Sequence, residues 1–352
     1  MNETAIPHDL PLPLPAPVPV LMAVLLIFFL LHIVFINMMI GGAFLTLWYE
    51  VKGRREKKWD ALAHDLAASI TVNKSIGVVL GVGPLLAINT LYTTYFYTAN
   101  ALTGDFWVSI IPLVAAAFLL TYLHKYVWEK MPKGLHIALI ALVVAIFAFI
   151  PLIFLTNVTL MLQPERWTEV AGFWDAMMMP NVWTRYTHFI LSCPAMMGLM
   201  MVWTYRRRSE AEIAEIGLPR DELIRTGYRW AFWPSLAQFA VGPLAWLTLP
   251  AVPGSVSGVN AVYALSALVA GVVCWIMWHE IKAPAGRIGR RFGATVATMF
   301  AVIVLMVVGR HMYREAAVDE HRTAMAEKTQ AFIAASAEAR DAARSAAGDQ
   351  EE

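Results

Sequence analysis

The chain has 352 residues, of which 59% are hydrophobic and only 15% are charged, against roughly 45–50% and about 25% in a typical soluble domain. So few charged side chains cannot cover the surface of a soluble protein of this length, which excludes an ordinary water-soluble fold. The formal net charge of +1 gives no overall attraction to nucleic acid, so no nucleic-acid partner is expected. Cys193 and Cys274 lie far apart and outside any CxxC or CxxCH motif, which argues against covalent haem c, a zinc cluster and a disulfide framework.

Long apolar runs dominate the chain. A bilayer core about 30 Å thick needs roughly 20 apolar residues in a helix. Eight runs meet this need, near residues 20–49, 70–98, 106–128, 135–160, 183–205, 229–250, 259–280 and 292–313. We therefore predict an all-α integral membrane protein, a bundle of about eight transmembrane helices.

The segments outside the bundle are short. Residues 1–19 contain no Lys or Arg, so they lack the basic region of a cleaved signal peptide and are predicted to remain as an outer N-terminal segment. Residues 20–313 form the membrane domain. Residues 314–352 form a charged helical tail, for which a solvated helix is favoured over a docking arm.

The distribution of basic residues predicts the direction of the bundle. Eighteen of the 27 Lys and Arg residues follow spans one, three, five and seven, whereas the alternate loops and their edges hold only Arg166 and Arg185. Because loops rich in Lys and Arg stay in the cytoplasm, both termini are predicted on the outer, periplasmic face. The expected location is the bacterial inner membrane.

Histidines within the spans are candidate functional residues, since ionisable groups are costly in lipid. His32 in span one, His188 in span five and His311 at the end of span eight all map to the outer half of the membrane. His124 and His136, at the cytoplasmic ends of spans three and four, are instead expected to reach the headgroups. Neutral imidazole is a common ligand of metals and of haem iron. We therefore predict that His32, His188 and His311 are haem-iron ligands.

Two arginines accompany these histidines. Arg185 lies one turn before His188, and Arg310 directly precedes His311. A guanidinium at the outer face pairs well with a carboxylate such as a haem propionate. Two sites that combine His and Arg favour an acidic macrocycle over a bare metal ion.

The segment from Pro180 to Met200, which contains Arg185 and His188, resembles the fifth helix of subunit I of cytochrome bd-type oxidases. In that family a basic residue precedes by three the histidine that ligates the low-spin haem b. His32 is similar to the first-helix ligand of the active-site haem. Further similarity lies in Val72–Gly77 with Gly81 and in the basic turn Trp128–Lys133.

The chain also departs from the family pattern. Residues 251–259 are too short to hold the family's quinol-binding loop, residues 263–271 contain no methionine, and residues 110–123 contain no carboxylate. Gly309, Arg310 and His311 resemble the family's Gly-Arg-Gln-Pro-Trp motif with His in place of Gln. This pattern is similar to the branch of the superfamily that lacks the quinol-binding loop.

The resemblance implies a haem-bearing electron-transfer subunit of a respiratory complex with other membrane subunits. It implies haem b at His188, and at His32 a second haem of b or d type that is catalytic if oxygen is reduced. A c-type cytochrome on the outer face is the implied electron donor. Two alternatives stay open: a quinol-linked cytochrome b that does not reduce oxygen, and a structural or transport subunit without haem.

Overall fold

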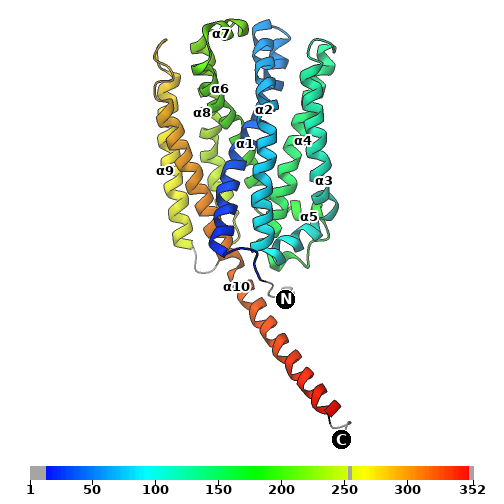
Figure 1. Ribbon diagram of the computed structural model, residues 1–352. Helices are drawn as coiled ribbons and strands as arrows, with labels where there is room; N and C mark the ends of the chain where they lie inside the picture. Colours follow the sequence, from blue (N-terminus) through cyan, green and yellow to red (C-terminus); the bar gives the residue numbers. More distant parts are fainter. Residues whose placement is uncertain (1–12, 253–255, 349–352) are drawn as a thin grey trace.

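The computed structural model describes residues 13–252 and 256–348, without the side chains of 71–75, 256 and 343–348. Parts of the predicted N-terminal segment, of Val72–Gly77 and of the 251–259 connection therefore lie outside the described residues. The described chain is helical and contains no strand, which confirms the all-α bundle (Figure 1). Its long helices are α1 (Val18–Gly53), α2 (Lys57–Leu91), α3 (Thr93–Tyr126), α4 (Lys133–Leu160), α6 (Val182–Arg207), α8 (Arg220–Leu247), α9 (Val256–Ile281) and α10 (Phe292–Gly348).

Six of these helices are long and apolar enough to cross a membrane: α1, α3, α4, α6, α9 and α10. The described part of α2 offers a shorter apolar stretch, Ile76–Leu91. The uncharged part of α8 contains Pro234, Gln238 and Pro243, which lower its hydropathy. The structure thus supports a multi-pass membrane protein, and eight membrane crossings remain a prediction.

One helix boundary differs from the sequence-based expectation. The apolar run at 70–98 predicts one helix, but the chain turns at Tyr92, where α2 ends and α3 begins. Helix α3 bends again at Gly104, whose backbone is not helical. No Gly or Pro lies between residues 85 and 103 to mark the turn at Tyr92.

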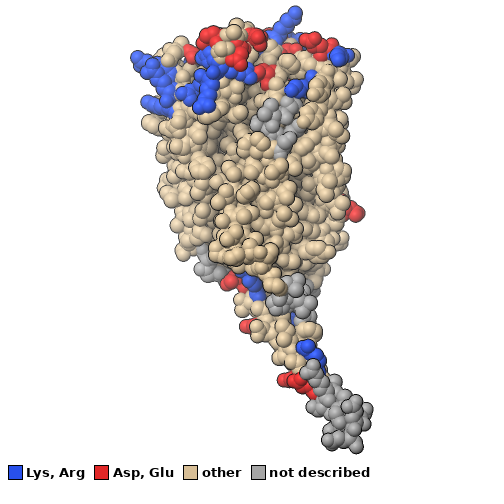
Figure 2. Space-filling view, viewed as in Figure 1, with Lys and Arg blue, Asp and Glu red and all other residues tan. Residues whose placement is uncertain are grey.

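The basic loops gather at one end of the bundle. The α1–α2, α3–α4 and α9–α10 connections and the α6–α8 connection lie together there, and both described ends of the chain lie at the opposite end (Figure 1). Figure 2 shows Lys and Arg side chains concentrated at the same end, above a wide surface that is almost free of charged side chains. This arrangement agrees with alternating helix directions, while the side of the membrane that each end faces stays a prediction.

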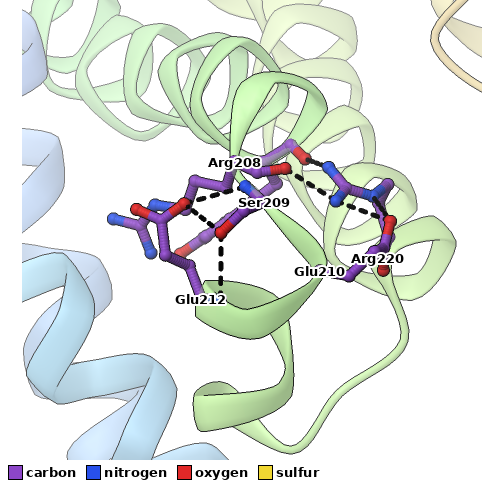
Figure 3. A network of polar contacts seen from close by, with 6 residues as sticks. Arg208, Ser209, Glu210, Glu212 and Arg220 are labelled. Atoms are coloured by element: carbon purple, nitrogen blue, oxygen red, sulfur yellow. Dashed lines mark hydrogen bonds and ion pairs between the residues drawn. The ribbon is translucent and has the colours of Figure 1, made fainter.

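The α6–α8 connection is held by a local polar network (Figure 3). It contains the short helix α7 (Glu210–Ile216), where Ser209 caps the N-terminus and exchanges hydrogen bonds with Glu212. Arg220 donates to the backbone carbonyls of Tyr205 and Arg208 at 2.6 and 2.7 Å and pairs with Glu210. These bonds satisfy the last carbonyls of α6, which have no partner within the helix.

Close helix packing forms the core between α6 and α8. A Cβ atom added at Gly198 would lie 2.5 Å from the carbonyl oxygen of Gly227, and one added at Gly227 would lie 2.8 Å from the carbonyl oxygen of Gly198. Small residues at such crossings let the two backbones approach in a membrane, where lipid provides little hydrophobic drive for association. Helix α6 also packs against α1, so it is central to the bundle.

Helix α10 continues without a break past residue 313 and projects beyond the bundle (Figure 1). Its first turns outside the apolar run are packed: Val318 is buried and Met325 is 5% exposed. The Tyr95 hydroxyl lies 3.1 Å from His321 Nδ1. Most described residues after Thr329 are exposed, so the tail is docked at its base and solvated toward its end.

Candidate functional site

Helix α6 carries Arg185 and His188 one turn apart. Arg185 donates a 2.7 Å hydrogen bond to the hydroxyl of Thr159 at the end of α4. The His188 carbonyl accepts a 2.8 Å bond from the Gln238 side chain on α8. The Nδ1 atom of the His188 ring is buried and has no hydrogen-bond partner, an unusual state for a polar atom away from water.

Helix α10 carries Arg310 and His311 next to one another and Arg314 about one turn further on. His311 Nδ1 is a second buried imidazole nitrogen without a partner, and one terminal nitrogen of Arg314 is also buried and unbonded. Gly309 lies against the Tyr263 ring of α9, where a Cβ atom would be 2.6 Å from that ring. The tight α9–α10 contact therefore fixes the register of these three side chains.

The structure brings the α6 and α10 arginines together. Arg310 and Arg314 both act electrostatically on Arg185. Among the ion pairs of the described residues, none involves any of these three arginines. Arg314 is buried, and Arg185 and Arg310 are half-buried. Grouped positive charges with little access to water and no carboxylate partner are costly, so this cluster is suited to an anionic ligand.

His32 lies on α1 and is held by α2. Its Nδ1 lies 2.8 Å from the carbonyl oxygen of Gly77. Since a carbonyl only accepts, Nδ1 is the donor and carries the proton, which leaves the lone pair of a neutral ring on Nε2. The ring also lies directly against Gly81, where an added Cβ would come within 2.7 Å of Cε1. A hydrogen bond of this kind fixes the tautomer of many metal-ligating histidines.

These features meet the requirements of a haem site. His188 and His311 each offer a buried nitrogen without a partner, His32 offers an oriented Nε2, and the arginine cluster offers charge for propionates. Arg185 and Arg310, expected at two separate sites, lie within electrostatic range of one another. The ligand roles of the three histidines stay predictions.

A second cluster, which sequence reasoning missed, lies at the opposite end of the bundle. Glu50 from α1, His124 from α3 and His136 from α4 are 0%, 1% and 0% exposed. The expectation that both histidines reach the headgroups is wrong, because a buried carboxylate pairs with them. Glu50 lies one residue beyond the predicted first span, and its position there was the available signal.

Comparison with known proteins supports the fold. No protein-family model and no curated protein matches the sequence. Among solved structures, the chain is similar to a bd oxidase from Geobacillus thermodenitrificans, with a TM-score of 0.65 and 12% sequence identity. The match covers 90% of this chain and 95% of that chain. The chain therefore has a bd-oxidase-like fold along nearly its whole length.

Proposed function

We propose that the protein is a haem-binding electron-transfer subunit of a bacterial inner-membrane respiratory complex, related to the bd-type oxidases. The observation that carries this proposal is the pair of buried, unpartnered imidazole nitrogens on His188 and His311, beside arginines that have no acidic partner. The bd-oxidase-like fold supports the same class. The similarity of Arg185 and His188 to the family's fifth-helix motif adds residue-level support.

Each side chain has a distinct role in this proposal. His188 ligates a b-type haem, His32 ligates a second haem of b or d type through Nε2, and His311 is a replacement ligand at one of them. Arg185 and Arg310 bind the propionates, because bidentate guanidinium–carboxylate pairs are strong and directional. Bound haem iron supplies one-electron redox chemistry, which the axial ligands and burial tune.

The hydrogen bond from His32 Nδ1 to the Gly77 carbonyl orients the second site in this proposal. With Nδ1 engaged, the ring keeps its lone pair on Nε2 and cannot turn freely. His32 would hold the second haem through Nε2, and that haem, when bound, would supply the chemistry of oxygen reduction. Electrons are proposed to enter from a c-type cytochrome at the outer face, with other membrane subunits completing the complex.

A pyridine haemochrome assay of the purified protein tests the proposal. We expect haem b in stoichiometric amount and loss of the low-spin spectrum in His188→Ala, while the control His279→Ala, at the other end of the bundle, keeps it. Absence of Soret absorbance would overturn the proposal, and so would unchanged spectra in both His188→Ala and His32→Ala. Reduction by quinol but not by cytochrome c would replace the proposed donor with quinol.

Carbon monoxide separates oxygen reduction from simple electron transfer. A reduced-plus-CO minus reduced spectrum is expected to show a bound ligand that disappears in His32→Ala. Without such a difference no iron has an open position, and the oxygen-reducing role assigned to His32 is wrong.

A further inference from the structure

The buried cluster of Glu50, His124 and His136 joins three helices at the end of the bundle rich in Lys and Arg. His124 Nε2 lies 3.0 Å from Glu50 Oε2, and His136 Nδ1 makes a short contact with Glu50 Oε1. One potential metal-ligand atom from each of the three residues lies within 4.8 Å of the other two. Eighteen residues of α1, a rise of about 27 Å at 1.5 Å per residue, separate Glu50 from His32, so this cluster is independent of the proposed haem ligands.

The hydrogen bonds of His136 leave its Nδ1 atom facing the carboxylate of Glu50. His136 Nε2 lies 2.9 Å from the backbone carbonyl of His124 and must donate to it. In a neutral ring the Nδ1 lone pair then points at the Glu50 carboxylate, so two acceptors face one another. Either a proton or a metal cation between them satisfies both, and the carbonyl bond is the outer interaction that commonly orients a metal-ligating histidine.

Nearby charge also favours a cation. Glu50 and Asp60 contribute two negative charges and Lys133 contributes one positive charge, so the carboxylates exceed the ammonium group by one charge. Lys133, with its side chain 33% exposed, bridges both carboxylates, at 3.0 Å from Glu50. It can keep Asp60 as its partner when it leaves Glu50, so it is a displaceable cation on the open side of the cluster.

We propose that Glu50, His124 and His136 form a binding site for a divalent transition-metal ion of the Zn²⁺ class, which ties α1, α3 and α4 together. Two imidazoles and one carboxylate suit zinc better than Mg²⁺ or Ca²⁺, which prefer oxygen ligands. Tetrahedral zinc separates its ligand atoms by about 3.3 Å at bond lengths of about 2.0–2.1 Å. The 3.0 Å between His124 Nε2 and Glu50 Oε2 is close to this, and the Glu50–His136 contact must widen.

Metal analysis of the full-length protein in detergent tests this site. The protein is exposed to ZnCl₂, passed through a desalting column, and its zinc is measured by mass spectrometry. We expect about one zinc per chain in the wild type and in the control His279→Ala, and less than about a tenth of that in His136→Ala. Zinc is read separately from iron, so loss of the haem proposal leaves this result unaffected.

A second variant covers the case in which His136→Ala fails to fold. Lys133→Met removes the competing ammonium but no ligand, and it is expected to bind zinc about two- to fivefold more tightly, in line with the strength of a partly exposed ion pair. Less than a tenth of a zinc per wild-type chain, equal zinc in a folded His136→Ala, or unchanged affinity in Lys133→Met would overturn the proposal. In the first case the cluster is an ion-pair network without metal.

Discussion

The contact between Gly81 and His32 allows a sharp test of how α2 holds the candidate ligand. In Gly81→Ala, the new methyl group would lie 2.7 Å from Cε1 and 2.9 Å from Nδ1 of the ring. Ordinary van der Waals contact begins near 3.4 Å, so the ring must move by about 0.7 Å. A shift of this size directed away from α2 would take the 2.8 Å bond to Gly77 beyond about 3.2 Å, the usual limit for an N–H···O bond.

The energetic cost follows from this displacement. Overpacking of a well-packed site costs about 1–3 kcal/mol, while replacing glycine by alanine inside a helix gains up to about 1 kcal/mol. Gly271→Ala in α9 is a matched control, because nothing lies within 4 Å of its added Cβ. We expect Gly81→Ala to be less stable than Gly271→Ala by about 1–3 kcal/mol.

Equilibrium unfolding in mixed micelles, followed by circular dichroism, measures this difference. Haem spectra of the same samples report on the His32 ring, and they are expected to change in Gly81→Ala only. Equal stability of the two variants would refute the reasoning, because it would mean that the ring moves without cost.

Three further predictions concern the core, a cap and the tail. Gly198→Ala, with its Cβ 2.5 Å from backbone atoms of α8, should lower the free energy of unfolding by about 1–3 kcal/mol. Ser209→Ala removes the cap of α7 and should cost about 1 kcal/mol, measured in the same unfolding assay. Burial opposes ionisation of Glu315, but hydrogen bonding to Tyr92 helps to lower its pKa below 4.5. Because the folded pKa is the lower one, Glu315 contributes stability above pH 4.5 that is lost as the pH falls through the folded pKa, and Glu315→Gln should remove this dependence.

Each of these predictions has its own control. Gly271→Ala serves for Gly198→Ala, and similar stability of the two would contradict tight α6–α8 packing. Ser209→Thr keeps a capping hydroxyl, so it should retain most of the stability that Ser209→Ala loses. An unchanged pH profile in Glu315→Gln would show that its contacts at the base of the tail do not contribute to stability.

The sequence by itself determined the membrane class and the order of the helices. Apolar runs of about 20 residues are a one-dimensional property, since each must satisfy its own backbone within a helix in lipid. The placement of Lys and Arg between alternate runs is equally local, and the structure gathers those loops at one end.

The tertiary structure alone decided which side chains meet. Glu50, His124 and His136 lie on three helices, and no spacing along the chain indicates that they share one buried cluster. The turn at Tyr92 lacks a sequence mark, and the unpartnered nitrogens of His188 and His311 become evident only once the neighbouring helices are in place. Hydropathy reports the solvent that each segment prefers, whereas burial and pairing depend on the rotation and approach of packed helices, which are set by contacts between distant residues.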